Sequence, residues 1–171
     1  MKRNLFIVAV CVQIVLLLLL ACSPYFLDRF GTEVTLQTVS SEHYERMWEN
    51  ELYLEYEAET VRPENWFVSD EVSFNESLYV LLTPNERGIH VVKAVSNQKL
   101  EEEAEDVMVK ARYQYQDEQD LHHLNIGISN HTLEKDDVSA LTNYKDRLLV
   151  TITFSPWGQK RIERVETVSG E

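Results

Sequence analysis

The chain has 171 residues, of which 29 are acidic and 16 basic, and its formal net charge at pH 7 is −13. This length accommodates one domain with its own core plus an N-terminal appendage. The charge argues against binding nucleic acid or anionic lipid through a basic patch, because such partners are attracted by clustered Lys and Arg. It favours a solvated acidic surface over a cation-binding function.

The N-terminal segment, residues 1–27, is apolar and differs in composition from the rest. Lys2 and Arg3 precede a nearly unbroken apolar run from Leu5 to Ala21. A bilayer core requires roughly 20 apolar residues, so the segment is long enough for one transmembrane helix. The basic pair predicts a cytoplasmic N-terminus, with residues 28–171 forming an extracytoplasmic domain.

A second interpretation of this segment concerns Cys22. Leu19-Leu20-Ala21-Cys22 resembles the lipobox of bacterial signal peptides, which are cut before a cysteine that then carries lipid. The apolar run exceeds the roughly 7 to 15 residues of a signal peptide's apolar region, which favours an uncleaved signal-anchor. Both alternatives place the protein at the cell membrane, either single-pass or lipid-anchored.

The exported part contains no cysteine, since Cys11 and Cys22 both lie in the N-terminal segment. A disulfide framework and a Cys-based metal site are therefore excluded there. We expect this domain to be held together by packing alone.

The exported part begins with two strand patterns. Thr32–Val39 places Val34, Leu36 and Thr38 on one face, which predicts a first strand. Ser40–Trp48 is expected to form a single helical turn or a tight connection.

Trp48–Val61 has a period of two, which predicts a strand with one apolar and one mostly carboxylate face. The alternating residues are Leu52, Leu54, Tyr56 and Ala58 against Tyr53, Glu55, Glu57 and Glu59.

Further strands follow at short intervals. Their expected positions are Leu78–Thr83 and Ile89–Val95 as a hairpin, Val107–Tyr115, two short strands around Gly127 within Leu121–Leu133, and a closing hairpin of Arg147–Ser155 and Lys160–Val168. Glu134–Lys145 is expected to be a loop or a short helix. Many short strands separated by turns predict an all-β, or β-rich α+β, fold: an antiparallel sandwich or partly open barrel after the N-terminal helix.

Several stretches resemble a known family. Glu33 to Thr38 is similar to its first strand, and Leu54 and Tyr56 fall where the Leu and final Tyr of a Gly-Asp-Tyr-x-x-Leu-x-Tyr motif belong. Gly127 and the closing hairpin match its C-terminal part. On these residues the chain resembles the GDYXXLXY family of membrane-anchored bacterial proteins. Glu49-Asn50-Glu51 replaces the Gly-Asp-Tyr triplet, so the chain is a divergent member. The resemblance implies an anchored extracytoplasmic domain and no established activity.

No metal or cofactor is expected. His122 and His123 are adjacent, and in a strand they would point to opposite faces, so one strand cannot present both to a single ion. The carboxylates of Glu55, Glu57 and Glu59 would stand about 6 to 7 Å apart. No Asp-rich calcium loop accompanies them, so whether this face binds a cation stays open. The preferred account is a cross-strand charge ladder with Lys93, Lys110 and Arg112.

No catalytic residue is expected either, because the sequence has no Gly-x-Ser-x-Gly elbow and no Ser-x-x-Lys. Trp66 and Phe67 are candidates for a partner-binding surface, with core packing as the alternative. The leading hypothesis is a non-catalytic, membrane-tethered domain that binds or supports another envelope component. One alternative is a lipoprotein, lipidated on Cys22, that binds a small ligand or peptide. Another is a hydrolase with an unrecognised site.

Overall fold

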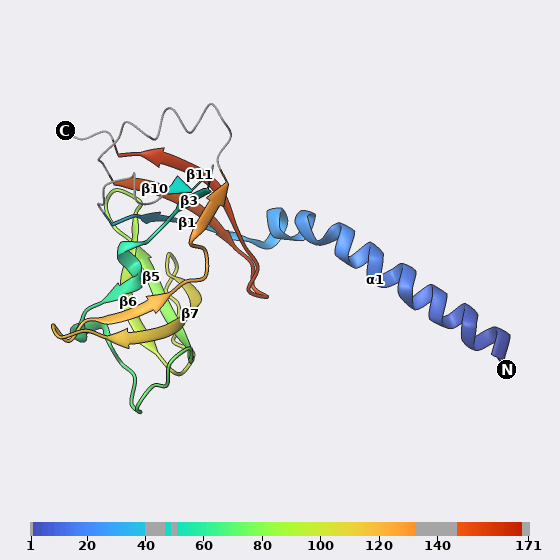
Figure 1. Cartoon of the computed structure of the whole chain (residues 1–171), viewed down its shortest axis with the longest axis horizontal. Coiled ribbons are helices and arrows are strands. Elements are labelled where there is room, and N and C mark those ends of the chain that lie inside the picture. The colour runs from blue at the N-terminus through green and yellow to red at the C-terminus, as the bar shows by residue number, and fades with distance from the viewer. Residues whose placement is uncertain (1, 40–46, 49–50, 133–146, 169–171) are drawn as a thin grey trace.

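The computed structural model describes residues 2–39, 47–48, 51–132 and 147–168. One long helix leads into a domain of short strands (Figure 1). The elements are α1 (Lys2–Phe30), β1 (Thr32–Gln37), β2 (Met47–Trp48), β3 (Glu51–Tyr53), β4 (Thr60–Val61), β5 (Ser77–Pro84), β6 (His90–Ser96), β7 (Val107–Gln116), β8 (His122–Asn125), β9 (Asn130–Thr132), β10 (Leu148–Phe154) and β11 (Lys160–Thr167), with 3₁₀ turns at Glu57–Glu59 and Pro63–Asn65.

Helix α1 extends away from the strands (Figure 1). Its side chains from Phe6 to Ala21 are all exposed, whereas Leu27, near its C-terminal end, is buried. Counting only the residues that the structure describes, no helix combines the length and the apolar character needed to cross a membrane.

The helix joins the domain through Gly31, whose N–H donates to the carbonyl of Leu27 at 2.8 Å. A Cβ atom at Gly31 would lie 2.2 Å from Thr153 Cγ2 and 2.5 Å from the Leu27 oxygen. Because real Cβ atoms do not approach other atoms so closely, only glycine fits at this joint. The helix and the domain therefore pack closely at this joint.

The largest sheet has five antiparallel strands in the order β4-β8-β7-β5-β6. Its two edges approach each other just beyond β4, where Trp66 forms a parallel bridge with Val95 of β6. The N–H of Phe67 donates to the Val95 carbonyl at 2.8 Å. This sheet is therefore nearly closed and barrel-like, which confirms the β-rich fold class.

Two three-stranded sheets complete the domain, in the orders β1-β10-β11 and β2-β3-β9. Strand β1 pairs antiparallel with β10, with Val34 opposite Ile152 and Leu36 opposite Val150. A bridge between Thr38 and Tyr56 connects the end of β1 to the segment after β3. Strands from both ends of the part that follows α1 thus meet in one domain.

The core is a single cluster to which all three sheets contribute. Its largest fully buried side chains are Tyr56, Leu36, Leu52, Leu54, Leu78, Leu82, Ile126, Leu148 and Ile152. Full burial of one large apolar side chain contributes about 1.5 to 3 kcal/mol, so this cluster supplies the main favourable term for folding.

The segment Glu51–Ala58 shows the predicted period of two, because its buried and exposed residues alternate without exception. The prediction of one continuous strand is wrong, however, since the chain turns at Glu57–Glu59. The Glu59 N–H donates to the Tyr56 carbonyl at 2.9 Å, and the Glu59 side chain accepts the Tyr56 N–H at 3.2 Å. These two bonds favour a 3₁₀ turn over continued strand pairing.

The predicted first strand, both hairpins and the two short strands around Gly127 are confirmed. A helical turn or a tight connection is predicted for Ser40–Trp48, and Met47–Trp48 forms β2, so a helical turn does not extend over these two residues. The remainder of that prediction, and the loop or helix predicted for residues 134–145, lie outside the described residues.

Candidate functional site

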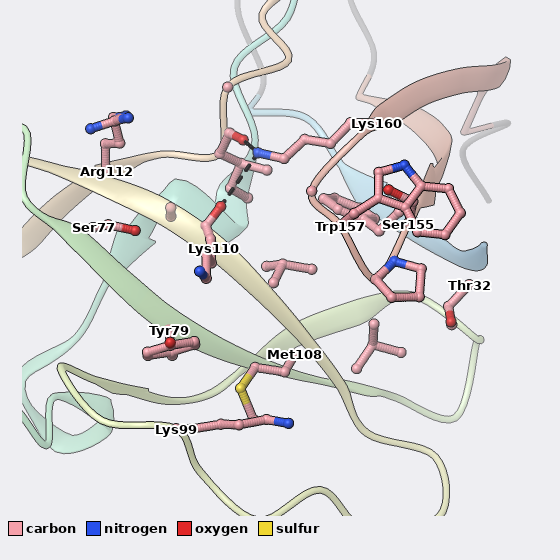
Figure 2. A pocket seen from close by; sticks show the side chains of 18 of the residues that line it. Thr32, Ser77, Tyr79, Lys99, Met108, Lys110, Arg112, Ser155, Trp157 and Lys160 are labelled. Atoms are coloured by element: carbon pink, nitrogen blue, oxygen red, sulfur yellow. Dashed lines mark hydrogen bonds between the residues drawn. The ribbon is translucent and has the colours of Figure 1, made fainter. Parts of the chain in front are cut away.

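A groove of about 770 Å³ lies between strand β7 and the turn that joins β10 to β11 (Figure 2). Residues Val107 to Arg112 of β7 line it along one side, and residues Phe154 to Gly158 of the turn line it along the other. Thr32, the first residue of β1, also lines it. Ligand sites in proteins commonly measure about 300 to 1,000 Å³, so the groove has the size of a binding site.

Four basic side chains line the groove, namely Lys99, Lys110, Arg112 and Lys160, whereas Glu102 is the one acidic residue among the described lining residues. None of Lys99, Lys110 and Arg112 forms an ion pair within the described part of the chain. In a chain with a net charge of −13, this is a local excess of positive charge. Such a groove attracts anions.

Neutral partners position two of these cations. The Lys110 ammonium lies 5.3 Å from the centroid of the Tyr79 ring, within the range of a cation–π contact. One guanidinium nitrogen of Arg112, Nη1, donates to the carbonyl of Asn75 at 3.0 Å. Both residues are exposed and alternate along β7 with buried Val109 and Ala111, so both stand on the solvent face of this strand, and both line the groove. Within the described part of the chain, their remaining side-chain N–H donors have no hydrogen-bond partner, so these donors are available to a ligand.

Lys160 has a different role. Its ammonium donates to the carbonyls of Ile126 and Lys110, which ties β11 to β7 and to the corner after β8 (Figure 2). Burial lowers the pKa of Lys160 against the attraction of Glu59. Gly127, at this corner, has a φ of +83°, and a Cβ there would lie 3.3 Å from the Lys160 nitrogen. Glycine therefore both permits the backbone conformation and leaves room for the lysine.

Next to the groove lies a partly buried polar group, the motif corner, which we define as Tyr56, Glu59, Ile126 and Lys160. The Glu59 carboxylate accepts the N–H of Ile126 at 2.7 Å and that of Tyr56 at 3.2 Å. Burial raises the pKa of Glu59 although both hydrogen bonds oppose the change. Burial, followed by the Glu59 charge, also raises the pKa of Tyr56, whose hydroxyl has no hydrogen-bond partner among the described residues.

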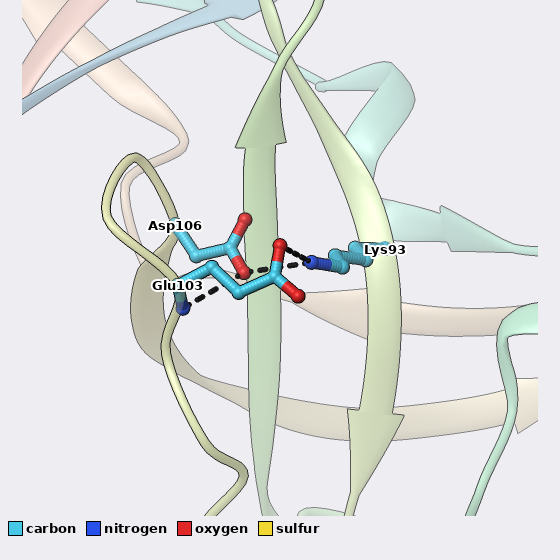
Figure 3. A network of polar contacts seen from close by, with 3 residues as sticks. All are labelled: Lys93, Glu103 and Asp106. Carbon is cyan, nitrogen blue, oxygen red and sulfur yellow. Dashed lines mark hydrogen bonds and ion pairs between the residues drawn. The ribbon is translucent and has the colours of Figure 1, made fainter.

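A second polar group, the loop clasp, consists of Lys93, Glu103 and Asp106 (Figure 3). The Lys93 ammonium lies 2.8 Å from Glu103 Oε2 and 2.9 Å from Asp106 Oδ2. The Glu103 N–H donates to the same Asp106 oxygen at 3.2 Å. These contacts tie the connection between β6 and β7 to β6, and that connection carries Lys99 to the edge of the groove.

The structure assigns the family-motif residues Leu54 and Tyr56 to the core, with 1% and 0% of their surface exposed. It separates Trp66 from Phe67. Trp66 is partly buried and stacks on His122 with ring centroids 3.8 Å apart, whereas Phe67 is 59% exposed. Only Phe67 is therefore available to a partner. The side chain of Cys22 lies outside the described residues.

The two histidines of β8 diverge as predicted. His122 stacks on Trp66, whereas His123 stacks on Tyr115 and lies 3.0 Å from Asp117. In the part of the chain that the structure describes, no three His, Cys, Asp or Glu side chains gather closely enough to hold a metal ion.

The prediction that Lys93 and Arg112 pair with the carboxylates of Glu55, Glu57 and Glu59 is wrong. Lys93 instead pairs with Glu103 and Asp106, and Arg112 donates to the backbone carbonyl of Asn75. Glu57 instead lies 3.4 Å from Arg147, and Glu59 turns inward. The turn at Glu57–Glu59 is the reason, because it ends the straight carboxylate face that the ladder requires.

Sequence reasoning missed the groove, because its basic residues come from the β6–β7 connection, β7 and β11. One local signal was available. Lys110 and Arg112 are two residues apart in an alternating strand, which places both charges on its solvent face. The net charge concealed this local reversal.

The fold and the groove define a class: a β-rich, nearly closed barrel-like domain that follows a helix of 29 residues and carries a basic groove near the end of that helix. The family described as GDYXXLXY protein matches residues 13–165, and the chain belongs to that family. No curated protein and no solved structure matches the chain.

Proposed function

We propose that this protein is a non-catalytic binding domain, residues 28–171, tethered outside the cytoplasm by residues 1–27, and that it binds or supports another envelope component. The observation that carries the proposal is the basic groove beside the end of α1. Thr32 lines the groove and is only two residues beyond Phe30, where the helix ends. A component of the membrane or its surface would meet the groove first.

The apolar surface of α1 supports the tether. The helix has 29 residues, and its side chains from Phe6 to Ala21 are exposed. An apolar surface of this extent marks a membrane or protein contact. Lys2 and Arg3 at the start of α1 favour a cytoplasmic N-terminus.

Cell fractionation of the full chain tests the tether. We expect the protein in the membrane fraction and its C-terminal domain accessible to protease from outside the cytoplasmic membrane. Metabolic lipid labelling, with Cys22→Ala as control, distinguishes the two anchors. Label on the wild type alone would replace the helical anchor with a lipidated Cys22. Recovery in the cytoplasm would overturn the tether itself.

Site-specific photo-crosslinking in intact membranes tests the binding role. A photoreactive residue at Lys110, inside the groove, should capture an envelope component. The same residue at Arg87, in the exposed β5–β6 turn, is the control. Equal capture from both positions would contradict the groove as the binding surface.

Phe67 and Trp66 form a second test. Trp66→Ala should lower the melting temperature because it removes the stack on His122, whereas Phe67→Ala should leave it unchanged. If Phe67→Ala abolished capture at Lys110, the binding surface would extend to Phe67. Unchanged capture would confine the surface to the groove.

A further inference from the structure

We propose that the basic groove binds the phosphate-bearing headgroup of an anionic phospholipid from the membrane that anchors the chain. This inference deepens the proposed function and depends on the tether. The net charge of −13 disfavours such a ligand, but the positive charges that line the groove favour it locally.

The location of the groove is the first step. The turn between β10 and β11 lies on the side of the domain from which α1 leaves (Figure 1). Trp157 in this turn is 51% exposed, and Phe30 at the end of α1 is 57% exposed. Trp is enriched at the interface between membrane and water, where its amphipathic ring lies at the level of the headgroups. With α1 in the membrane, the turn and the adjoining groove would face the headgroups.

Charge is the second step. An acidic domain is repelled by an anionic membrane surface over a distance of about 8 to 10 Å, the screening length at physiological salt. Lys99, Lys110 and Arg112 reverse that repulsion locally, since none of them is neutralised by a carboxylate among the described residues. The groove is thus a place where an anionic headgroup can approach this domain closely.

The donors in the groove are the third step. Lys110 and Arg112 stand on the same face of β7, and a guanidinium offers five N–H donors in a geometry that matches phosphate. Arg112 uses one nitrogen for Asn75. The Lys160 ammonium already donates to two backbone carbonyls, so its role is to hold β11 against β7 and the residues that follow β8. We therefore assign phosphate contact to Lys110 and Arg112.

The apolar side of the groove distinguishes a lipid from a free anion. Val107, Met108, Phe154 and Trp157 line the groove together with the cations (Figure 2). Inorganic phosphate would leave most of the volume of about 770 Å³ to water. A phospholipid would place its phosphate near Lys110 and its glycerol and upper acyl chains along the apolar side chains.

Native mass spectrometry of the full chain provides the test. The protein, in non-ionic detergent, is mixed with equal amounts of phosphatidylglycerol and phosphatidylcholine, and retained lipids are counted. We expect phosphatidylglycerol to be preferred. Each cation near a membrane surface contributes about 1 kcal/mol, so Lys110→Gln or Arg112→Gln should weaken this preference about fivefold, and the double variant about 25-fold.

Arg62→Gln combined with Arg87→Gln is the matched control, because it removes two exposed positive charges outside the groove. The control should keep the preference, and near-ultraviolet circular dichroism should show that both double variants fold. Equal losses in the two double variants, or no preference in the wild type, would overturn the inference.

Soluble anions identify the source of the phosphate. Inorganic phosphate and glycerol 3-phosphate should raise the melting temperature of the chain far less than phosphatidylglycerol does. An equal rise that depends on Lys110 and Arg112 would assign the groove to a free anion and overturn the lipid. Cell fractionation tests the tether separately. If the protein were recovered in the cytoplasm but still preferred phosphatidylglycerol in detergent, the proposed tethered function would be wrong, whereas lipid binding by the groove would stand.

Discussion

The motif corner and the loop clasp each hold a backbone turn with a carboxylate, yet the pKa values of the two carboxylates move in opposite directions. Hydrogen bonding to the Lys93 ammonium, the largest effect, lowers the pKa of Asp106. Burial, the largest effect at Glu59, raises its pKa although Lys160 is nearby. Lys160 donates to two carbonyls and cannot serve Glu59 as Lys93 serves Asp106. Direct contact with a cation, more than its proximity, decides the direction.

Among the substitutions in the two polar groups, replacing Tyr56 should lower the stability of the domain most. Tyr56→Ala removes a fully buried ring from the motif corner and should lower the free energy of unfolding by about 3 to 5 kcal/mol, measured by urea denaturation. Tyr56→Phe is the control and should cost nothing, because the hydroxyl has no partner among the described residues. A clear loss of stability in Tyr56→Phe would reveal a hydrogen-bond partner for the hydroxyl.

Glu59→Ala should have the next largest effect. It leaves the N–H groups of Ile126 and Tyr56 without their acceptor, which should cost about 1 to 3 kcal/mol of unfolding free energy. Glu59→Gln should cost less, because its amide oxygen still accepts one N–H and its neutral side chain avoids burying a charge. If the two variants were equally unstable, the charge of Glu59 and not its hydrogen bonding would maintain the turn.

The pH dependence of stability sharpens the contrast. The raised pKa of Glu59 means that its contribution is present below its ordinary pKa and is lost as the pH rises through the folded value. The lowered pKa of Asp106 means that its contribution is present above its ordinary pKa and is lost as the pH falls through the folded value. Urea denaturation from about pH 3 to about pH 7 brackets both ordinary values.

Each neutral variant should therefore remove the pH dependence of unfolding free energy that its carboxylate contributes. Relative to wild type, Glu59→Gln should become more favourable as the pH rises, and Asp106→Asn should become more favourable as the pH falls. Profiles that changed in the same direction in both variants would contradict the opposite pKa shifts.

The smallest expected effect is the coupling between the two groups. Glu59 and Asp106 share no hydrogen-bond partner among the described residues, so the loss of stability in the double variant of Glu59→Gln and Asp106→Asn should equal the sum of the losses in the single variants within measurement error. A measurable coupling energy would show that the two turns respond to each other, through β7 and the groove between them.

The local sequence pattern correctly predicted those elements whose conformation and buried face depend mainly on residues close in the chain. The alternation from Leu52 to Ala58 and the β5–β6 hairpin belong to this group, since each depends on neighbours in the chain. The turn at Glu57–Glu59 could not be predicted, because it depends on Glu59 reaching Ile126, 67 residues away.

Two further features could not be predicted from the sequence: the near closure of the five-stranded sheet, and the groove. Trp66 meets Val95 only once the five strands have assembled, and the pattern does not specify strand order. Lys160 reaches the corner at Ile126 from a strand that forms much later in the chain. Net charge, a sum over the whole molecule, could not show that three cations lie together without an ion pair to any described residue.

Because the helix and the domain pack closely at Gly31, the tilt of the helix affects the orientation of the domain. A side chain at Gly31 would clash with Thr153 and Leu27, so the helix and the domain pack closely at this joint. Helix α1 spans about 44 Å at the usual rise of 1.5 Å per residue, so a small change in its tilt would swing the domain through a similar angle. In the proposed anchored state, bilayer thickness, which sets helix tilt, would also set the height of the groove above the headgroups.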